Sequence, residues 1–204
     1  FAMTEYALRQ AKGMTFDTPF DLLDRLLPAT WEYGKAITRN PDLRMTFALN
    51  ALVGVDAAAW LLYARENDFT SFDDMIPAEY QPLLSHRHSL VGCIPLMAYA
   101  VPMPEIIRHV EEGYFFMKVK IGSDPDKDGD QEKMLQWDMA RVEEIHRAIG
   151  SRETPYTTNG KIPYYFDANG RYDSKDRLRR LLDHCDKIGM LDQIMIVEEP
   201  FPED

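Results

Sequence analysis

Charged side chains follow three apolar runs of the sequence, at the point where each run stops. Lys118 and Lys120 close the run FFMKVK, Asp167 follows PYYF, and Glu198 follows IMIV. Carboxylate oxygens without histidine or thiolate are the ligands that a hard ion such as Mg²⁺ or Mn²⁺ prefers. Lysines beside such a carboxylate pair would supply the opposite charge. These residue types therefore indicate a charged pocket for a divalent cation, provided that the fold brings the run ends together.

The two lysines place a condition on the strand that carries them. Side chains two positions apart in a strand point to the same face, so the ammonium groups of Lys118 and Lys120 would lie about 7 Å apart. Two like charges on one buried face would be costly, because each loses its hydration without gaining a partner. Their face must therefore meet either water or negatively charged groups.

From residue 90 onward, short apolar segments alternate with amphipathic segments of helical period. This alternation is typical of βαβ units and a parallel sheet. In such sheets functional side chains collect at the carboxyl ends of the strands, and neighbouring strands lie about 4.8 Å apart. Carboxylates from adjacent strand ends can therefore reach one cation. We expect strands within residues 91–100, 114–122, 161–170 and 192–200, and helices within 102–113, 130–150 and 174–190.

The N-terminal part of the chain has helical patterns. Thr18 can cap a helix whose first turn contains Pro19, and Pro28 is expected to break or kink that helix. The long apolar pattern at residues 43–66 predicts a largely buried helix. Residues 71–89, rich in proline, serine and charge, are interpreted as a connection.

The composition excludes several classes of protein. At 204 residues and 45% hydrophobic content the chain can bury a core in one or two domains. A net charge of −11 argues against nucleic acid or an anionic membrane as the main partner. Cys93 and Cys185 lie too far apart in sequence to indicate a zinc site or a disulfide framework, so a cytoplasmic location is expected. No apolar run approaches the roughly 18 residues of a membrane span.

An ordered set of motifs resembles the enolase superfamily, and within it the branch of mandelate racemase and muconate lactonizing enzyme. The set is K-x-K, then D-x-N, then (I/V)-E-(E/Q)-P on successive strands, after a helical region with the stretch VDAAAW. The resemblance implies an α/β fold: the first half of a (β/α) TIM-like barrel with strands one to four, preceded by the helical part of an α+β capping domain. Residues 1–90 would belong to the capping domain and residues 91–204 to the barrel.

The same resemblance implies roles for the two lysines. Lys120 would be the base that removes the proton α to a substrate carboxylate. Lys118 would help to hold that carboxylate and would lower the proton affinity of its neighbour by like-charge repulsion.

The resemblance also implies a metal site. Asp167 and Glu198 match two ligands of a Mg²⁺ ion, with Mn²⁺ as a possible substitute, and Asn169 and Glu199 would be supporting residues. The metal would stabilise the enolate that forms when the proton leaves. The implied reactions are racemisation, epimerisation or dehydration of a small carboxylic acid, such as an acid sugar, a hydroxy acid or an amino-acid derivative, by a homo-oligomeric enzyme.

The sequence departs from the family pattern in two respects. The third metal ligand and the acid or base on the opposite face of the substrate lie beyond the final residues PFPED, so we expect the natural chain to be longer at both ends. The distance from Lys120 to Asp167 is also long for one βα unit, and residues 123–131 and 151–162 are interpreted as insertions.

Two other functions are compatible with the residues. One of the lysines could form a Schiff base, as in a lyase or aldolase built on a β/α barrel. Alternatively, the strand-end charges could merely solvate the rim of a noncatalytic barrel. The carboxylates Asp167 and Glu198 favour the metal-dependent enzyme, because a Schiff-base enzyme has no need of a carboxylate pair for a metal.

Overall fold

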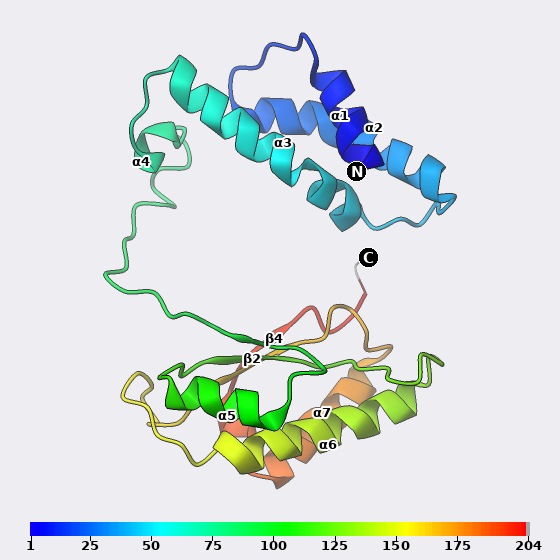
Figure 1. Cartoon of the computed structure of the whole chain (residues 1–204), viewed down its shortest axis with the longest axis vertical. Helices are drawn as coiled ribbons and strands as arrows, with labels where there is room; N and C mark the ends of the chain where they lie inside the picture. The colour runs from blue at the N-terminus through cyan, green and yellow to red at the C-terminus, as the bar shows by residue number, and fades with distance from the viewer. Residues whose placement is uncertain (203–204) are drawn as a thin grey trace. The chain divides into compact units, whose positions relative to one another are not determined.

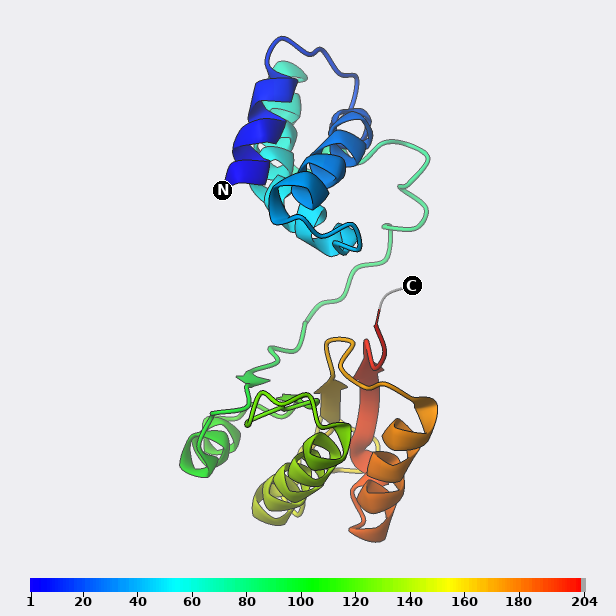
Figure 2. The ribbon, with the colours of Figure 1, turned by 90° about the vertical axis from the view of Figure 1, so that its right-hand side faces the viewer.

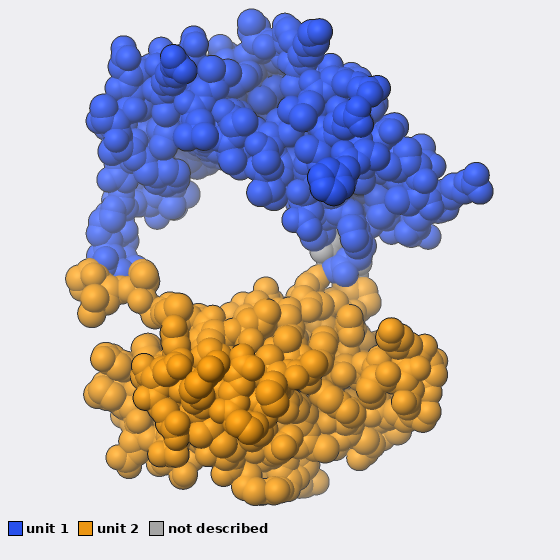
Figure 3. Space-filling model, in the orientation of Figure 1, with its two compact units in different colours: residues 1–88 blue, residues 89–204 orange. Residues whose placement is uncertain are grey.

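The computed structural model describes residues 1–202. The chain divides into two compact units, Phe1–His88 and Ser89–Asp204 (Figure 3). The sequence pattern predicts a boundary after residue 90, and the assignment of the two parts as capping and barrel domains stays a prediction.

Three helices, α1, α2 and α3, pack against one another in the N-terminal unit, and a short helix, α4, follows them (Figure 1). Their bounds are Ala2–Ala11, Pro19–Thr38, Met45–Glu66 and Phe72–Met75. The core that they share contains Ala7, Leu22, Leu26, Leu52, Val55 and Ala59. The prediction of a helical N-terminal region is confirmed.

Helix α2 begins as predicted and continues through Pro28. The Thr18 side chain accepts a hydrogen bond from the Asp21 N–H at 3.3 Å and caps the helix. Pro28 lies inside the helix, so the predicted break does not occur, and the alternative of a kink at Pro28 stays a prediction. Proline removes one backbone hydrogen bond, yet Leu26 and Thr30 on either side of it are buried. Packing against the neighbouring helices thus keeps α2 continuous across the proline.

Helix α3 lies where it was predicted, but it is not largely buried. Its buried residues are Ala48, Leu52, Val55 and Ala59. The large apolar side chains that remain exposed are Met45, Phe47, Leu49, Val53, Leu61 and Leu62. By length and composition this helix could also cross a membrane, and it is the one such helix among residues 1–202. Of its most apolar window of 18 residues, 22% is buried within the protein. The sequence prediction overlooked it because polar residues interrupt the apolar run.

A parallel sheet forms the C-terminal unit, with strand order β1-β2-β3-β4. The chain alternates strand and helix, as predicted for the first half of a (β/α) barrel, and the predicted fold class is confirmed. A 3₁₀ turn, η1 (Leu191–Gln193), precedes the last strand. The strands are β1 (Leu96–Met97), β2 (Met117–Lys120), β3 (Tyr164–Asp167) and β4 (Ile194–Glu198), and the helices are α5 (Met103–Glu111), α6 (Gln131–Ile149) and α7 (Lys175–Lys187).

The three helices of this unit lie against one face of the sheet (Figure 2). Val119 of β2 and Phe166 of β3 are at most 1% exposed and belong to one core with Val142 of α6 and Leu181 of α7. Strands β1 and β3 are shorter than the apolar segments that predicted them. Each begins directly after a proline, which has no N–H for the strand ladder.

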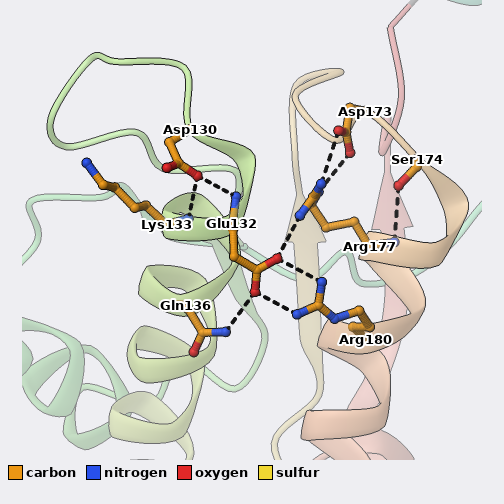
Figure 4. A network of polar contacts seen from close by, with 8 residues as sticks. All are labelled: Asp130, Glu132, Lys133, Gln136, Asp173, Ser174, Arg177 and Arg180. Carbon is orange, nitrogen blue, oxygen red and sulfur yellow. Dashed lines mark hydrogen bonds and ion pairs between the residues drawn. The ribbon is translucent and has the colours of Figure 1, made fainter.

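A polar network joins the first turns of α6 and α7 (Figure 4). The Glu132 carboxylate accepts hydrogen bonds from Arg180 at 2.6 and 2.8 Å and from Arg177 at 3.0 Å. Hydrogen bonds from Arg180 and Gln136, together with the charges of both arginines, lower the pKa of Glu132 to about 2. The network ties together the two helices that support β2 and β3.

Candidate functional site

The register of the strands brings the predicted residues to one face of the sheet. Lys118 pairs with Tyr165, Lys120 pairs with Asp167, and Asp167 pairs with Glu198. Because side chains alternate along a strand, all five point away from the helices that cover the opposite face. The four predicted residues among them, Lys118, Lys120, Asp167 and Glu198, also lie at or near the carboxyl ends of their strands, where the sequence placed them.

Asp167 is the centre of this cluster. It is 1% exposed, and its Oδ2 lies 2.9 Å from Lys118 Nζ and 2.5 Å from Lys120 Nζ. Its Oδ1 accepts a hydrogen bond from the Asn169 N–H at 3.1 Å. Burial alone would raise the pKa of Asp167, but the hydrogen bonds from the two lysines outweigh burial and hold the pKa below its ordinary value. Asp167 is therefore an anion over the usual pH range.

Glu198 completes the acidic pair. Its Oε2 accepts hydrogen bonds from the Lys118 ammonium group and, at 2.6 Å, from the Tyr165 hydroxyl. Burial would lower the pKa of Lys118, but the hydrogen bonds that its ammonium group donates to Asp167 and Glu198 outweigh burial and raise the pKa. Lys118 is thus held as a cation between the two carboxylates.

The predicted supporting residues lie just after β3 and β4, Asn169 two residues after Asp167 and Glu199 directly after Glu198. The Asn169 side-chain oxygen accepts a hydrogen bond from Lys120 Nζ at 2.7 Å, so Asn169 belongs to the cluster. The backbone carbonyl of Glu199 accepts a hydrogen bond from the Gly170 N–H at 2.7 Å. Both residues have left-handed backbone conformations, with φ of +48° and +41°. Such conformations are uncommon outside glycine and are concentrated at functional sites.

Two residues of the site's surroundings were missed by the sequence analysis. Tyr165 was taken as one more apolar residue of a strand, although it stands two positions before Asp167 and so shares its face. Asp138 was also missed, although it interrupts the apolar face of α6 formed by Met134 and Val142. A lone carboxylate at a core position of an amphipathic helix is the signal that could have found it.

Asp138 holds the loop that leaves β2. This carboxylate is 1% exposed and accepts hydrogen bonds from the N–H groups of Gly122 at 2.6 Å and Ser123 at 3.2 Å. It also accepts one from the Tyr172 hydroxyl at 2.8 Å, in the segment that follows β3. Burial raises the pKa of Asp138 to about 6. One buried carboxylate thus joins the chain segments that leave both β2 and β3.

Gly122 is required in this loop for two reasons. Its φ of +80° is a left-handed conformation, and an added Cβ would lie 2.8 Å from the Arg171 Cβ. Arg171 also donates a hydrogen bond to the Gly122 carbonyl at 3.1 Å. A side chain at residue 122 would therefore collide with Arg171 and displace the loop that begins just after Lys120.

The chemistry of the donor set fits a hard divalent cation. Asp167 and Glu198 offer carboxylate oxygens, Asn169 offers an amide oxygen, and these are the donors that Mg²⁺ and Mn²⁺ prefer. Within residues 1–202 there is no group of three or more His, Cys, Asp or Glu residues placed to hold a metal. The cluster therefore offers two carboxylates and one amide oxygen, which are donors of the kind that such an ion prefers.

Comparisons with known proteins support the fold. No family model and no curated protein sequence matches the chain. Among solved structures, the magnesium complex of a mandelate racemase/muconate lactonizing protein from Paracoccus denitrificans PD1222 is similar, with 18% sequence identity and a TM-score of 0.53. The match covers 91% of this chain and 42% of that one, so the chain spans less than half of the neighbour's length.

A second solved structure gives a weaker match. It is a protein named for mandelate racemase, from Bordetella bronchiseptica RB50, in complex with 2-oxoglutarate/phosphate. Its identity is 18%, its TM-score is 0.42, and the match covers 91% of this chain and 41% of that one. The TM-score is too low to carry an argument, so the conclusion about the fold depends on the first structure.

Proposed function

We propose that this chain is part of an enolase-superfamily enzyme of the mandelate racemase and muconate lactonizing enzyme branch, which removes the proton α to a substrate carboxylate. The observation that carries the proposal is the pairing of Lys120 Nζ with Asp167 Oδ2 at 2.5 Å, beside the Lys118–Glu198 pair on the same face. The proposed base and the two proposed oxygen ligands thus stand together at the carboxyl ends of adjacent parallel strands. Such strand ends are where β/α enzymes carry their chemistry.

Asp167 and Glu198 would hold the metal ion. Mg²⁺, or Mn²⁺ with the same preference for oxygen, would stabilise negative charge that develops on the substrate carboxylate. The fold neighbour from Paracoccus denitrificans was solved with magnesium, which supports this choice of ion. Asn169 accepts a hydrogen bond from Lys120 at 2.7 Å and would keep the lysine directed at the site.

Lys120 would act as the base. In its neutral form the Nζ atom accepts the proton from the substrate α-carbon, which leaves the electron pair delocalised over the carboxylate as an enolate. Return of a proton to the α-carbon gives racemisation or epimerisation, whereas loss of a leaving group from the β-carbon gives dehydration. The ammonium group of Lys118 would hold the substrate carboxylate beside the base.

The Schiff-base alternative is less well supported by the surroundings of the lysines. A Schiff-base lysine must be neutral to attack a carbonyl group, so it needs a lowered pKa. Contacts with Asp167 and Glu198 instead raise the pKa of Lys118. The metal-dependent reaction also gives the carboxylates Asp167 and Glu198 a role, whereas a Schiff-base enzyme has no need of a carboxylate pair.

The proposal is tested by solvent exchange. A panel of acid sugars, hydroxy acids and N-acyl amino acids is incubated with the protein in D₂O, and deuterium at the α-carbon is measured by NMR. We expect exchange that stops with EDTA and returns with Mg²⁺. Exchange that persists in EDTA would refute the metal's role, and trapping of a substrate by borohydride would favour the Schiff-base enzyme.

A further inference from the structure

Strand β3 carries two consecutive tyrosines that point to opposite faces of the sheet. Tyr164 is 0% exposed and faces the helices, where its hydroxyl lies 3.3 Å from His146 Nδ1. Tyr165 shares the other face with Asp167. The pair therefore offers a residue at the site and a matched neighbour outside it.

Tyr165 contacts both halves of the charged cluster. Its hydroxyl donates a hydrogen bond to Glu198 Oε2 at 2.6 Å, and its ring lies under the Lys118 ammonium group, 4.6 Å from Nζ to the ring centroid. The Phe116 ring packs beside it with the centroids 6.1 Å apart. The tyrosine is thus held by packing on one side and bonded to a predicted metal ligand on the other.

Filling space does not account for this residue. Tyr165 is in register with Ile196 on β4, and an aliphatic side chain at residue 165 could fill the same layer without a polar atom. Instead, the tyrosine reaches along the strand direction and places its hydroxyl at the next layer, on Glu198. A hydrogen bond of 2.6 Å to a carboxylate fixes the position of that carboxylate more firmly than a neutral pair would.

The contact with Tyr165 also differs in kind from the contact with Lys118. An ammonium group and a bound cation carry the same sign and compete for Glu198, whereas a neutral hydroxyl can donate to a carboxylate that also holds a metal. Carboxylates that ligate metals are commonly oriented by such outer hydrogen bonds, and loss of one typically weakens metal binding 10- to 100-fold.

We infer that Tyr165 is a positioning residue that orients Glu198 as a metal ligand through its hydroxyl group. This inference deepens the proposed function and rests on it. Tyr165 is not assigned a direct contact with the metal or with the substrate. Its effect is exerted through Glu198.

The test is a titration of the full chain with Mg²⁺, in which isothermal titration calorimetry measures the affinity. Tyr165→Phe keeps the ring over Lys118 and removes only the hydroxyl, and we expect Mg²⁺ affinity to fall about tenfold. The matched control is Tyr164→Phe, which removes a hydroxyl from the adjacent residue on the opposite face, and we expect its Mg²⁺ affinity to equal that of the wild type. Thermal unfolding is measured alongside to show that both variants are folded.

Each outcome of the titration is decisive. Equal affinity in the wild type and Tyr165→Phe would overturn the inference and leave the proposed function standing. Equal losses in both variants would also overturn it, because the effect would then come from the strand and not from the Glu198 contact. A wild-type protein that binds no Mg²⁺ would refute the proposed function itself. If Tyr165→Phe does not fold, Tyr165→His keeps a donor, and a wild-type affinity in that variant supports the inference while a tenfold loss counts against it.

Discussion

Asp167 Oδ2 lies 2.5 Å from Lys120 Nζ and 2.9 Å from Lys118 Nζ, so that one buried carboxylate oxygen serves both lysines of the K-x-K motif. This relationship accounts for two like charges on one face of a strand. Each ammonium group has a negative partner, and Glu198 supplies a second carboxylate to Lys118. The polar face of β2 is therefore part of a balanced cluster of two cations and two anions, which a divalent cation and an anionic substrate could enter together.

Replacement of the proposed base should separate chemistry from metal binding. We expect Lys120→Ala to abolish exchange of the substrate α-proton with solvent deuterium. Its Mg²⁺ affinity should equal or exceed that of the wild type, because an ammonium group that competes for Asp167 has been removed. NMR detection of exchange and calorimetric titration check the two parts. Undiminished exchange would show that another group is the base.

Replacement of the carboxylates should weaken metal binding, which replacement of Lys120 should leave intact. Asp167→Asn and Glu198→Gln keep the size of each side chain and remove its charge, so we expect each to weaken Mg²⁺ binding at least tenfold. Asp167→Asn should have the larger effect, because Asp167 is 1% exposed and contacts both lysines. Asp176→Asn, at an exposed position on α7, is the control for loss of a surface charge. Mg²⁺ titration curves of Asp167→Asn and Glu198→Gln that coincide with the curve of the wild type would contradict the ligand roles.

Asp138 should make the C-terminal unit less stable as the pH rises from about 4 to about 6. Burial raises the pKa of Asp138 to about 6 in the folded chain, above the ordinary value of 3.8 for an unfolded aspartate. The folded state therefore binds the proton first, and the stability from protonation is fully present below pH 3.8 and lost as the pH rises through about 6. A shift of this size corresponds to about 3 kcal/mol of unfolding free energy.

The measurement compares the wild type with Asp138→Asn. Urea unfolding is followed by the fluorescence of Trp137 after replacement of Trp31 and Trp60 by phenylalanine, so that the signal reports the C-terminal unit. The difference in unfolding free energy between the two proteins should change across this pH range, because the asparagine does not titrate. Parallel pH profiles would show that Asp138 is not the titrating group.

The location of the site could be predicted from the sequence because parallel strands align their carboxyl ends. A charge directly after an apolar run was enough to find Lys120, Asp167 and Glu198, and the strand order then brought them together. The role of Tyr165 could not be read from composition, since it depends on which of two adjacent tyrosines faces the site. That choice follows from the register of β3, which begins at Tyr164 after Pro163.

The errors in the helical region have a related cause. An apolar pattern reports which residues could be buried, but it does not report which of them find neighbours. Helix α3 is apolar on nearly all sides, yet only one face packs against α1 and α2. Pro28 likewise has a known local cost, and the packing of Leu26 on α2 outweighs it.

Two adjacent residues of α3 should therefore differ sharply in their contribution to stability. Leu52 is 2% exposed and belongs to the core of the N-terminal unit, whereas Val53 is 60% exposed. We expect Leu52→Ala to lower the unfolding free energy of this unit by about 2–5 kcal/mol, because a buried cavity is created. Val53→Ala should change it by no more than about 0.5 kcal/mol, because an exposed position loses no packing and alanine favours the helix. Urea unfolding in a Trp137→Phe background, where Trp31 and Trp60 report the N-terminal unit, measures both values. Equal losses in the two variants would mean that the face of α3 carrying Val53 is also covered in solution.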